Sequence, residues 1–175
     1  MTIPLIEDTC AVAAPAPADD DGFALNGAWH PLPADPSQRL LDHLRADLRQ
    51  FGTKEGCRQG DCGSCTVLVD GEARYACLMP MGQVAGRSVV TVEGIGAGTQ
   101  CGGRLQQAFL AHQAVQCGFC TPGMLLASAA AIDAGRVTDR ASARDAIDGV
   151  LCRCTGYQKI VDAVTEAGCG AAARP

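Results

Sequence analysis

Apolar residues between Phe23 and about Gly98 fall in short runs separated by turn signals, the pattern of a small β-sheet. The dipeptides Asn26-Gly27 and Asp70-Gly71 favour tight hairpin turns, and each is flanked by apolar residues. The β-branched run from Ser88 to Val92 indicates another strand. This part of the chain is therefore predicted to consist largely of hairpins.

One amphipathic helix is predicted between the two hairpins. Asp35 is placed to act as its N-cap, Pro36 takes the first helical position, and Gln38 completes a pattern similar to a capping box. The residues that follow form an apolar stripe opposite a charged one: Leu40, Leu41, Leu44 and Leu48 against Arg39, Asp42, Arg45 and Arg49. The helix is expected to lie across the sheet.

After the glycine-rich segment from Gly94 to Gly98 the strand signals stop and helical spacing begins. Four groups of residues recur at helical intervals: Leu105, Ala108, Phe109 and His112; Met124, Leu125, Ser128, Ala131 and Ile132; Ala143, Ala146, Ile147 and Val150; Ile160, Val161 and Val164. A compact domain of four helices is predicted for this second half.

Eight of the eleven cysteines fall into two groups of four with different spacings. The groups are Cys57-x4-Cys62-x2-Cys65-x11-Cys77 and Cys117-x2-Cys120-x31-Cys152-x-Cys154. Four thiolates that converge on one point suit a [2Fe–2S] cluster, and the first spacing is that of plant-type ferredoxins. Each group is therefore predicted to bind one such cluster.

The first ligand loop also indicates the fold. Glycines at 52, 56, 60 and 63 lie among or beside its first three cysteines. A loop that aims three thiolates at one cluster must bend sharply, and glycine tolerates the dihedral angles that this requires. With the hairpins and the helix, the loop predicts an α+β fold, in which an N-terminal plant-ferredoxin-like β-grasp domain is followed by a four-helix domain.

The predicted boundaries follow from composition. Residues 1–21 contain Ala-Pro repeats and three consecutive aspartates with few large apolar groups, so they are expected to form a flexible arm. The ferredoxin-like domain is assigned to residues 22–98, the helical domain to residues 99–167 and a C-terminal tail to residues 168–175.

Each cysteine pair of the second group precedes a predicted helix. Cys117 and Cys120 come before Thr121-Pro122, interpreted as a cap followed by proline at the first helical position, and Cys152 and Cys154 come before the apparent capping box Thr155 to Gln158. Helix N-termini offer free N–H groups and partial positive charge, which suits an anionic, thiolate-ligated cluster.

The cysteine spacings fit zinc or disulfides less well. Zinc also takes four cysteines, commonly as two C-x2-C knuckles, but neither group has two such pairs. A disulfide scaffold would suit a secreted protein, whereas no signal peptide is present. The remaining Cys10, Cys101 and Cys169 are interpreted as spare thiols, the first and last in tails.

Composition excludes several function classes. The net charge of -5, the lack of any Lys/Arg run and an aromatic content of 4% argue against a nucleic-acid partner. No apolar stretch is long enough to span a bilayer, so we expect no membrane association and a cytoplasmic location. His30, His43 and His112 show no metal-ligand spacing, and no phosphate-binding loop, nucleophile elbow or dinucleotide fingerprint occurs.

Three segments, Gly56 to Thr66, Gln116 to Gly123 and Cys152 to Tyr157, closely resemble the iron–sulfur part of the xanthine oxidase family of molybdenum hydroxylases. The resemblance covers about residues 23 to 167 in the same order. It implies two [2Fe–2S] clusters that pass electrons from a molybdopterin centre to FAD. The helical-domain cluster would face the molybdopterin, and the ferredoxin-type cluster would face the flavin.

The resemblance also implies partners and contacts. The chain is similar to the separate small subunit of the bacterial three-subunit type, beside a large molybdopterin-binding subunit and a medium FAD-binding subunit, as αβγ or (αβγ)2. Gln116 and Cys154 match positions whose groups contact the pterin in relatives, although the Gln116 amide could instead satisfy local backbone groups.

No substrate site is expected on this chain. Family members act on N-heteroaromatics, purines, aldehydes or carbon monoxide, and family breadth favours an N-heteroaromatic. Two other classes stay open at this stage: a free-standing soluble carrier with two clusters, and a zinc-binding interaction module without redox activity.

Overall fold

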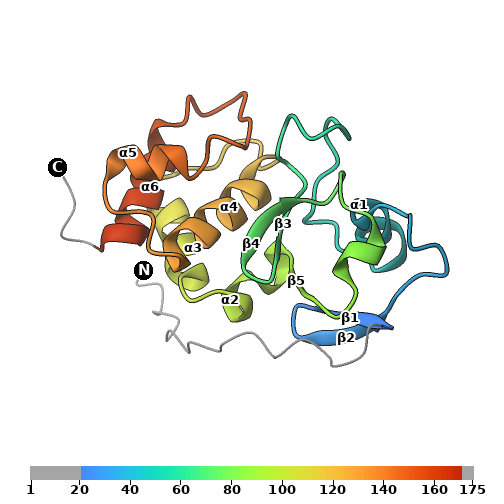
Figure 1. The fold of residues 1–175 in the computed structure, drawn as a ribbon. Helices are drawn as coiled ribbons and strands as arrows, with labels where there is room; N and C mark the ends of the chain where they lie inside the picture. Colours follow the sequence, from blue (N-terminus) through green and yellow to red (C-terminus); the bar gives the residue numbers. More distant parts are fainter. Residues whose placement is uncertain (1–20, 171–175) are drawn as a thin grey trace, which may run out of the picture.

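Five short strands form one mixed sheet in the order β2-β1-β5-β3-β4 in the computed structural model, which describes residues 21–170 (Figure 1). Most neighbouring strands are antiparallel, and β1 and β5 run parallel. The strands are β1 Gly22–Leu25, β2 Ala28–Pro31, β3 Thr66–Val69, β4 Glu72–Tyr75 and β5 Ser88–Val90.

Both predicted hairpins are confirmed. β1 pairs with β2 across Asn26-Gly27, and β3 pairs with β4 across Asp70-Gly71. All four turn residues have positive φ, between 50° and 86°. Two-residue turns of this kind match the right-handed twist of the strands they join, which explains why the local sequence predicts them correctly.

Both faces of the central strand β3 are covered. Val67 and Val69 pack in the core cluster that contains the leucines of α1, whereas Leu68 packs in the cluster of the helical half. Alternate side chains of a strand point to opposite faces, so one strand serves both cores. The helical half therefore covers the sheet face opposite α1.

The predicted amphipathic helix is present, but its predicted start is wrong. Regular helix begins at α1 Leu40–Asp42 and continues as a π-helical turn, η1 His43–Asp47, with Arg39 rather than Asp35 at the N-cap position. Its buried leucines are Leu40, Leu41 and Leu44.

Pairing of the residues around Arg39 with a distant segment explains why the helix begins later than predicted. Arg39 is extended and forms a bridge with Pro80, and the Leu40 N–H donates to the Met79 carbonyl at 2.8 Å. Asp35 instead accepts from the backbone and hydroxyl of Ser37, and Gln38 donates to Asp47. Tertiary hydrogen bonds therefore override the local capping signal.

The second half is helical, as predicted. Two short 3-10 turns, η2 Met81–Val84 and η3 Val92–Gly94, lie in the connections around β5, and the glycine-rich segment forms the short helix α2 Ile95–Gly98. Four helices correspond to the predicted groups: α3 Gly102–Ala111, α4 Thr121–Asp133, α5 Arg140–Asp145 and α6 Gln158–Cys169. The third prediction is only partly correct, because α5 ends at Asp145 and leaves Ala146, Ile147 and Val150 in the turn that follows.

Two capping predictions in this half need correction. Cys120, not Thr121, occupies the N-cap position of α4, so Pro122 lies one position deeper than expected. α6 begins at Gln158 after Tyr157, which has a φ of 67°, and the Gln158 amide accepts from Arg140. Because that amide is engaged elsewhere, the capping box predicted from Thr155 to Gln158 is absent.

The chain ends also differ in part from expectation. α6 extends through Cys169, so this cysteine belongs to a helix and not to a tail. The predicted arm lies outside the described residues except for Asp21, whose carbonyl accepts from Leu32. Within residues 21–170, no helix has the length and apolar character needed to cross a bilayer.

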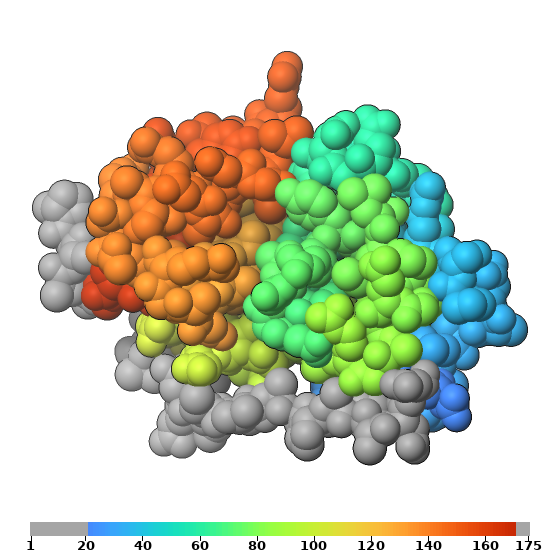
Figure 2. All heavy atoms as spheres, in the orientation of Figure 1, coloured from blue at the N-terminus to red at the C-terminus, as the bar shows by residue number. Residues whose placement is uncertain are grey.

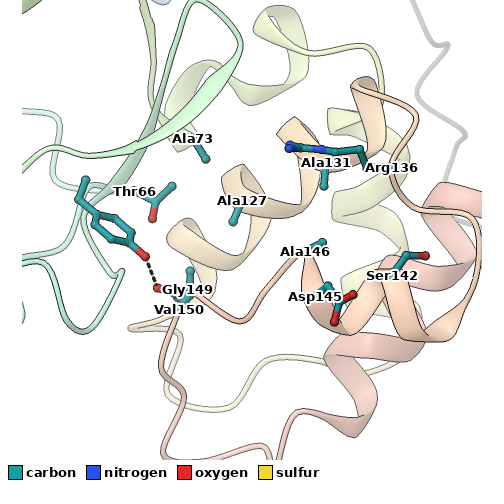
Figure 3. A pocket seen from close by; sticks show the side chains of 11 residues that line it. Thr66, Ala73, Ala127, Ala131, Arg136, Ser142, Asp145, Ala146, Gly149 and Val150 are labelled. Atoms are coloured by element: carbon teal, nitrogen blue, oxygen red, sulfur yellow. Dashed lines mark hydrogen bonds between the residues drawn. The ribbon is translucent and has the colours of Figure 1, made fainter.

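The two halves lie side by side, with α4 next to β3 and β4 (Figures 1 and 2). Between them is a pocket of about 430 Å³, lined from one side by Thr66, Ala73 and Tyr75 and from the other by residues of α4 and α5, including Ala127 and Asp145 (Figure 3).

Candidate iron–sulfur sites

The first cysteine group lies on the ligand loop and just after β4. Cys57 and Cys62 are partly exposed, whereas Cys65 and Cys77 are 3% and 1% exposed in the core beneath α1. The loop enters from the region after η1 and leads directly into β3, which fixes Cys65 at the strand edge. The structure thus brings all four predicted residues to one end of the sheet.

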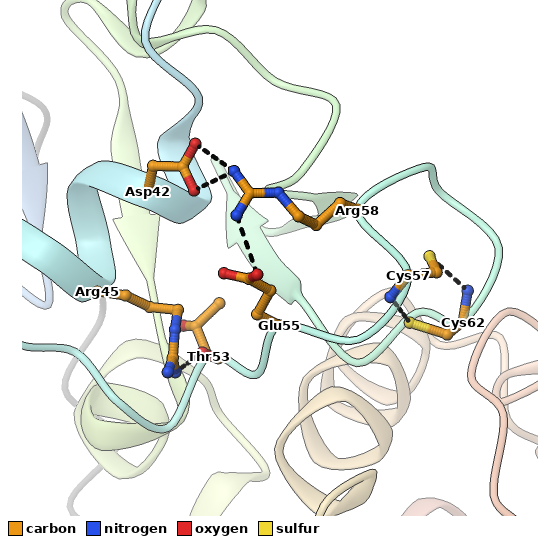
Figure 4. Close-up of polar contacts among 7 residues, drawn as sticks. All are labelled: Asp42, Arg45, Thr53, Glu55, Cys57, Arg58 and Cys62. Carbon is orange, nitrogen blue, oxygen red and sulfur yellow. Dashed lines mark hydrogen bonds and ion pairs between the residues drawn. The ribbon is translucent and has the colours of Figure 1, made fainter.

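Backbone N–H groups surround the Cys57 sulfur. The N–H groups of Gln59, Asp61 and Cys62 point at it from 3.5, 3.2 and 3.3 Å. The Cys57 N–H in turn points at the Cys62 sulfur at 3.4 Å (Figure 4). These donors, that of Gln59 foremost, lower the pKa of the Cys57 thiol to about 6. Such N–H groups stabilise thiolate ligands of a cluster.

Close packing and positive φ angles shape this loop. A Cβ on Gly56 would lie 2.7 Å from the Cys62 sulfur, so only glycine leaves that sulfur in place. Arg58, Gly60 and Gly63 have positive φ values of 59°, 86° and 67°. The glycines predicted to bend the loop are therefore needed at these positions, and Arg58 takes the same conformation as a non-glycine residue.

Ion pairs anchor the strained Arg58 position. Its guanidinium donates twice to the Asp42 carboxylate of α1, at 2.8 and 2.9 Å, and once to Glu55 at 2.9 Å (Figure 4). Arg45 fixes the start of the same loop by donating to the Thr53 carbonyl at 2.8 Å. From the sequence, Arg45 was expected only to belong to the charged face of the helix, and Arg58 only to lie next to a predicted ligand.

The buried Cys65 has a different electrostatic environment from that of Cys57. Burial, with a further contribution from the adjacent Cys77, raises the pKa of the Cys65 thiol to about 12. Iron would have to displace this proton, and bonds to iron would then offset the cost of burying the thiolate charge.

The second cysteine group lies where three segments meet. Cys117 and Cys154 are exposed, and their sulfurs are 3.5 Å apart. Cys120 is buried at the start of α4, and burial raises the pKa of its thiol to about 12. Its neighbour Cys152 is partly buried. The structure again brings all four predicted residues together.

Two side-chain hydroxyl groups in the segment before α6 contact Cys152, and the sequence did not predict these contacts. The Tyr157 hydroxyl accepts from the Cys152 N–H at 2.8 Å, and the Thr155 hydroxyl lies 3.1 Å from the Cys152 sulfur. Burial acts to raise the pKa of the Cys152 thiol, but the Thr155 hydroxyl and neighbouring N–H groups outweigh it, so the pKa falls. Thr155 therefore stabilises a thiolate instead of capping a helix.

The second group and Cys62 of the first group line a common groove. This groove, of about 240 Å³, is lined by Gly56, Cys62 and Ser64 from the first loop and by the second group, together with Phe119, Leu151 and Arg153. The Leu151 N–H donates to the Cys62 carbonyl at 2.9 Å. Ligands predicted from separate motifs are thus neighbours in space.

The donor chemistry of both groups fits a [2Fe–2S] cluster. Each group consists of two close sulfur pairs: Cys57 with Cys62, Cys65 with Cys77, Cys117 with Cys154 and Cys120 with Cys152. Paired thiolates are what two bridged irons require, because each iron takes two of the four ligands.

The remaining candidates have other partners. Cys101 is buried with its sulfur directed at the Ala129 carbonyl, and Cys169 points at the Val137 carbonyl. Cys10 lies outside the described residues. His43 contacts Asp47 at 2.7 Å, and His112 contacts Glu166 at 2.9 Å.

Comparison with known proteins agrees with this arrangement. Residues 23–86 match the family model described as a 2Fe-2S iron-sulfur cluster binding domain, and residues 91–165 match the [2Fe-2S] binding domain. The nicotine 6-hydroxylase small subunit of Paenarthrobacter nicotinovorans is 41% identical over 158 residues, which cover 89% of this chain and 94% of that protein. The chain belongs to the xanthine oxidase family as an iron–sulfur small subunit.

Another relative and a solved structure are also similar to most of this chain. The caffeine dehydrogenase subunit gamma of Pseudomonas sp. (strain CBB1) is 45% identical, over 81% of this chain and 86% of that subunit. The crystal structure of quinoline 2-oxidoreductase from Pseudomonas putida 86 superposes with a TM-score of 0.77 at 41% identity, covering 86% of this chain and 93% of that one. The chain is an electron-transfer subunit of a molybdenum-containing oxidoreductase and has two 2Fe–2S binding domains.

Proposed function

We propose that the first cluster is held by Cys57, Cys62, Cys65 and Cys77 and the second by Cys117, Cys120, Cys152 and Cys154. Each set supplies two close sulfur pairs from segments that the fold brings together. A [2Fe–2S] cluster carries one electron at a time. The chain's own contribution is to hold the clusters, surround them with N–H donors and keep them close to each other.

The direction of electron flow is the second part of the proposal. The second cluster accepts electrons from a molybdopterin centre on a large subunit, and the first cluster passes them to FAD on a medium subunit, in an αβγ or (αβγ)2 complex in the cytoplasm. The solvent exposure of the second cysteine group supports its assignment to the molybdopterin-binding partner. Cys117 and Cys154 are exposed, and so are the apolar Val115, Phe119 and Leu151 nearby in sequence. Exposed apolar patches mark protein interfaces.

Gln116 and Cys154 are proposed to contact the pterin. Gln116 is exposed and adjoins the exposed ligand Cys117, so its amide is available to a partner subunit. Its role would be a hydrogen bond that orients the pterin beside the second cluster.

The substrate is proposed to be an N-heteroaromatic compound. Relatives that the chain covers over most of their length are named for nicotine, nicotinate and caffeine, and the matching crystal structure is named for quinoline. The substrate pocket itself would lie on the large subunit, so the purified chain alone should oxidise none of these compounds.

Replacing Gln116 by alanine should slow electron transfer from molybdenum while leaving both clusters intact. Loss of one hydrogen bond costs about 1 kcal/mol, and more when a buried partner is left unsatisfied, so a partial defect is expected. The measurement is rapid-mixing reduction of the clusters in the complete complex, driven by whichever of nicotine, nicotinate, caffeine or quinoline reduces the wild-type complex.

Gln107→Ala is the matched control, because Gln107 lies on α3 outside both cysteine groups. In this control variant, the clusters should be reduced at the wild-type rate. An unchanged rate in Gln116→Ala as well would remove Gln116 from the pathway.

A further inference from the structure

Three glycines meet where the two halves of the chain touch, and each lies close in sequence to a cluster ligand. Gly63 directly follows Cys62, Gly123 lies in the first turn of α4 just after Cys120, and Gly149 precedes Cys152 by three residues. Every chain segment in this contact therefore carries a proposed ligand. We refer to Gly63, Gly123 and Gly149 as the glycine contact.

The backbones in the glycine contact touch directly. A Cβ on Gly63 would lie 2.0 Å from the Gly149 carbonyl oxygen, and a Cβ on Gly123 would lie 2.6 Å from the Gly63 carbonyl oxygen. Atoms in ordinary contact are about 3.5–4.0 Å apart. No side chain fits between these segments without separating them, so they lie about as close as two backbones can.

Hydrogen bonds fix the contact from both sides. The Gly63 carbonyl accepts from the Thr66 N–H at 3.1 Å and from the Thr66 hydroxyl at 2.6 Å. The Tyr75 hydroxyl on β4 donates to the Gly149 carbonyl at 2.9 Å, at the edge of the interdomain pocket (Figure 3). The Leu151 N–H donates to the Cys62 carbonyl at 2.9 Å, so a ligand of one group is joined to a neighbour of a ligand of the other.

We propose that the glycine contact, held by Tyr75, sets the separation of the two clusters and thereby the rate of electron transfer between them. Electron tunnelling slows steeply with distance, and a side chain at Gly63 or Gly123 would push the ligand loops apart. The proposal rests on the proposed ligand sets. The three glycines and Tyr75 are positioning residues, since they act through the loops that carry the ligands.

The test uses the full-length chain with both clusters, purified with any accompanying subunits and reduced with dithionite. Each reduced [2Fe–2S] cluster is paramagnetic, and the magnetic splitting between two such clusters falls with the cube of their separation. We expect Gly123→Ala to show a smaller splitting and severalfold slower electron transfer between the clusters. Both cluster signals and their reduction potentials should persist, because no ligand is changed.

A second pair of variants tests the other side of the contact. In Gly149→Ala the new Cβ would lie 2.5 Å from the Tyr75 hydroxyl but 3.7 Å from the ring carbon that bears it. This substitution should also reduce the splitting. Tyr75→Phe removes the hydroxyl that donates to the Gly149 carbonyl without adding an atom to the contact, so it should reduce the splitting as well.

Gly96→Ala is the control, because a Cβ there meets no atom within 4 Å and Gly96 does not have positive φ. It should keep the wild-type splitting. If Gly123→Ala loses a cluster, Gly149→Ala and Tyr75→Phe decide the question. Unchanged splitting in Gly123→Ala, Gly149→Ala and Tyr75→Phe, among those variants that keep both clusters, would overturn the proposal. Absence of two clusters from the wild-type chain would instead contradict the proposed function.

Discussion

Replacing Cys77 by serine should remove the first cluster and leave the second in place. Cys77 is 1% exposed and pairs with Cys65 in the core beneath α1. Serine has nearly the same shape but lacks the thiolate, so the first set is left with three ligands. Because the second set comes from other segments, we expect about half of the iron and one of two EPR signals to be lost.

Cys101→Ser is a closely matched control for that experiment. Cys101 is also 1% exposed in an apolar core, but it belongs to neither set. Both variants place a hydroxyl in a buried site, so any general destabilisation should be similar. The control should retain all the iron. Equal iron loss in the two variants would mean that the effect at Cys77 is structural and does not come from ligation.

Replacing Cys152 by serine should stop electrons from the substrate reaching the first cluster. Cys152 pairs with Cys120, and its sulfur is oriented by the Thr155 hydroxyl and its N–H by the Tyr157 hydroxyl. Losing this ligand should abolish the second cluster. If that cluster stands between molybdenum and the first cluster, substrate should no longer reduce the first cluster, whereas dithionite still should.

The comparison variant is Cys169→Ser, since Cys169 is also partly buried and ends α6 outside both sets. In the complete complex it should keep substrate-driven reduction of both clusters. Rapid reduction of the first cluster by substrate in Cys152→Ser would show that electrons bypass the second cluster, and the proposed order would be wrong.

Local patterns predicted those parts of the fold that are decided by neighbouring residues. The Asn26-Gly27 and Asp70-Gly71 turns form because their positive φ angles are set within the dipeptide. The first cysteine spacing likewise predicted residues that the structure brings together, since three of them lie on one short loop. That both groups bind clusters stays a prediction. Helical spacing predicted the four main helices, although not their first residues, and α5 ends earlier than its spacing predicts.

Predictions failed where distant segments compete with local signals. Asp35 does not cap α1 because Arg39 and Leu40 pair with the segment around Pro80. The Gln158 amide is engaged by Arg140 and cannot complete a box with Thr155. In both cases a hydrogen bond between residues far apart in sequence replaced the expected local one.

The contacts that join the two sites could not be predicted from sequence. Tyr75 and Gly149 are 74 positions apart, and no periodicity links them. From the sequence, Gly63 was expected only to bend the first ligand loop and Gly123 had no predicted role, whereas the structure gives both a steric reason to be glycine. Backbone contacts of this kind have no composition signal, because they depend on how two domains pack.

The central claim is that this chain is a carrier of two [2Fe–2S] clusters. Iron, zinc and acid-labile sulfide analysis of the anaerobically purified full-length chain, with EPR of the reduced protein, tests it most directly. We expect about four iron and about four sulfide per chain, as two distinct EPR signals. Stoichiometric zinc without sulfide, in a colourless protein, would contradict it.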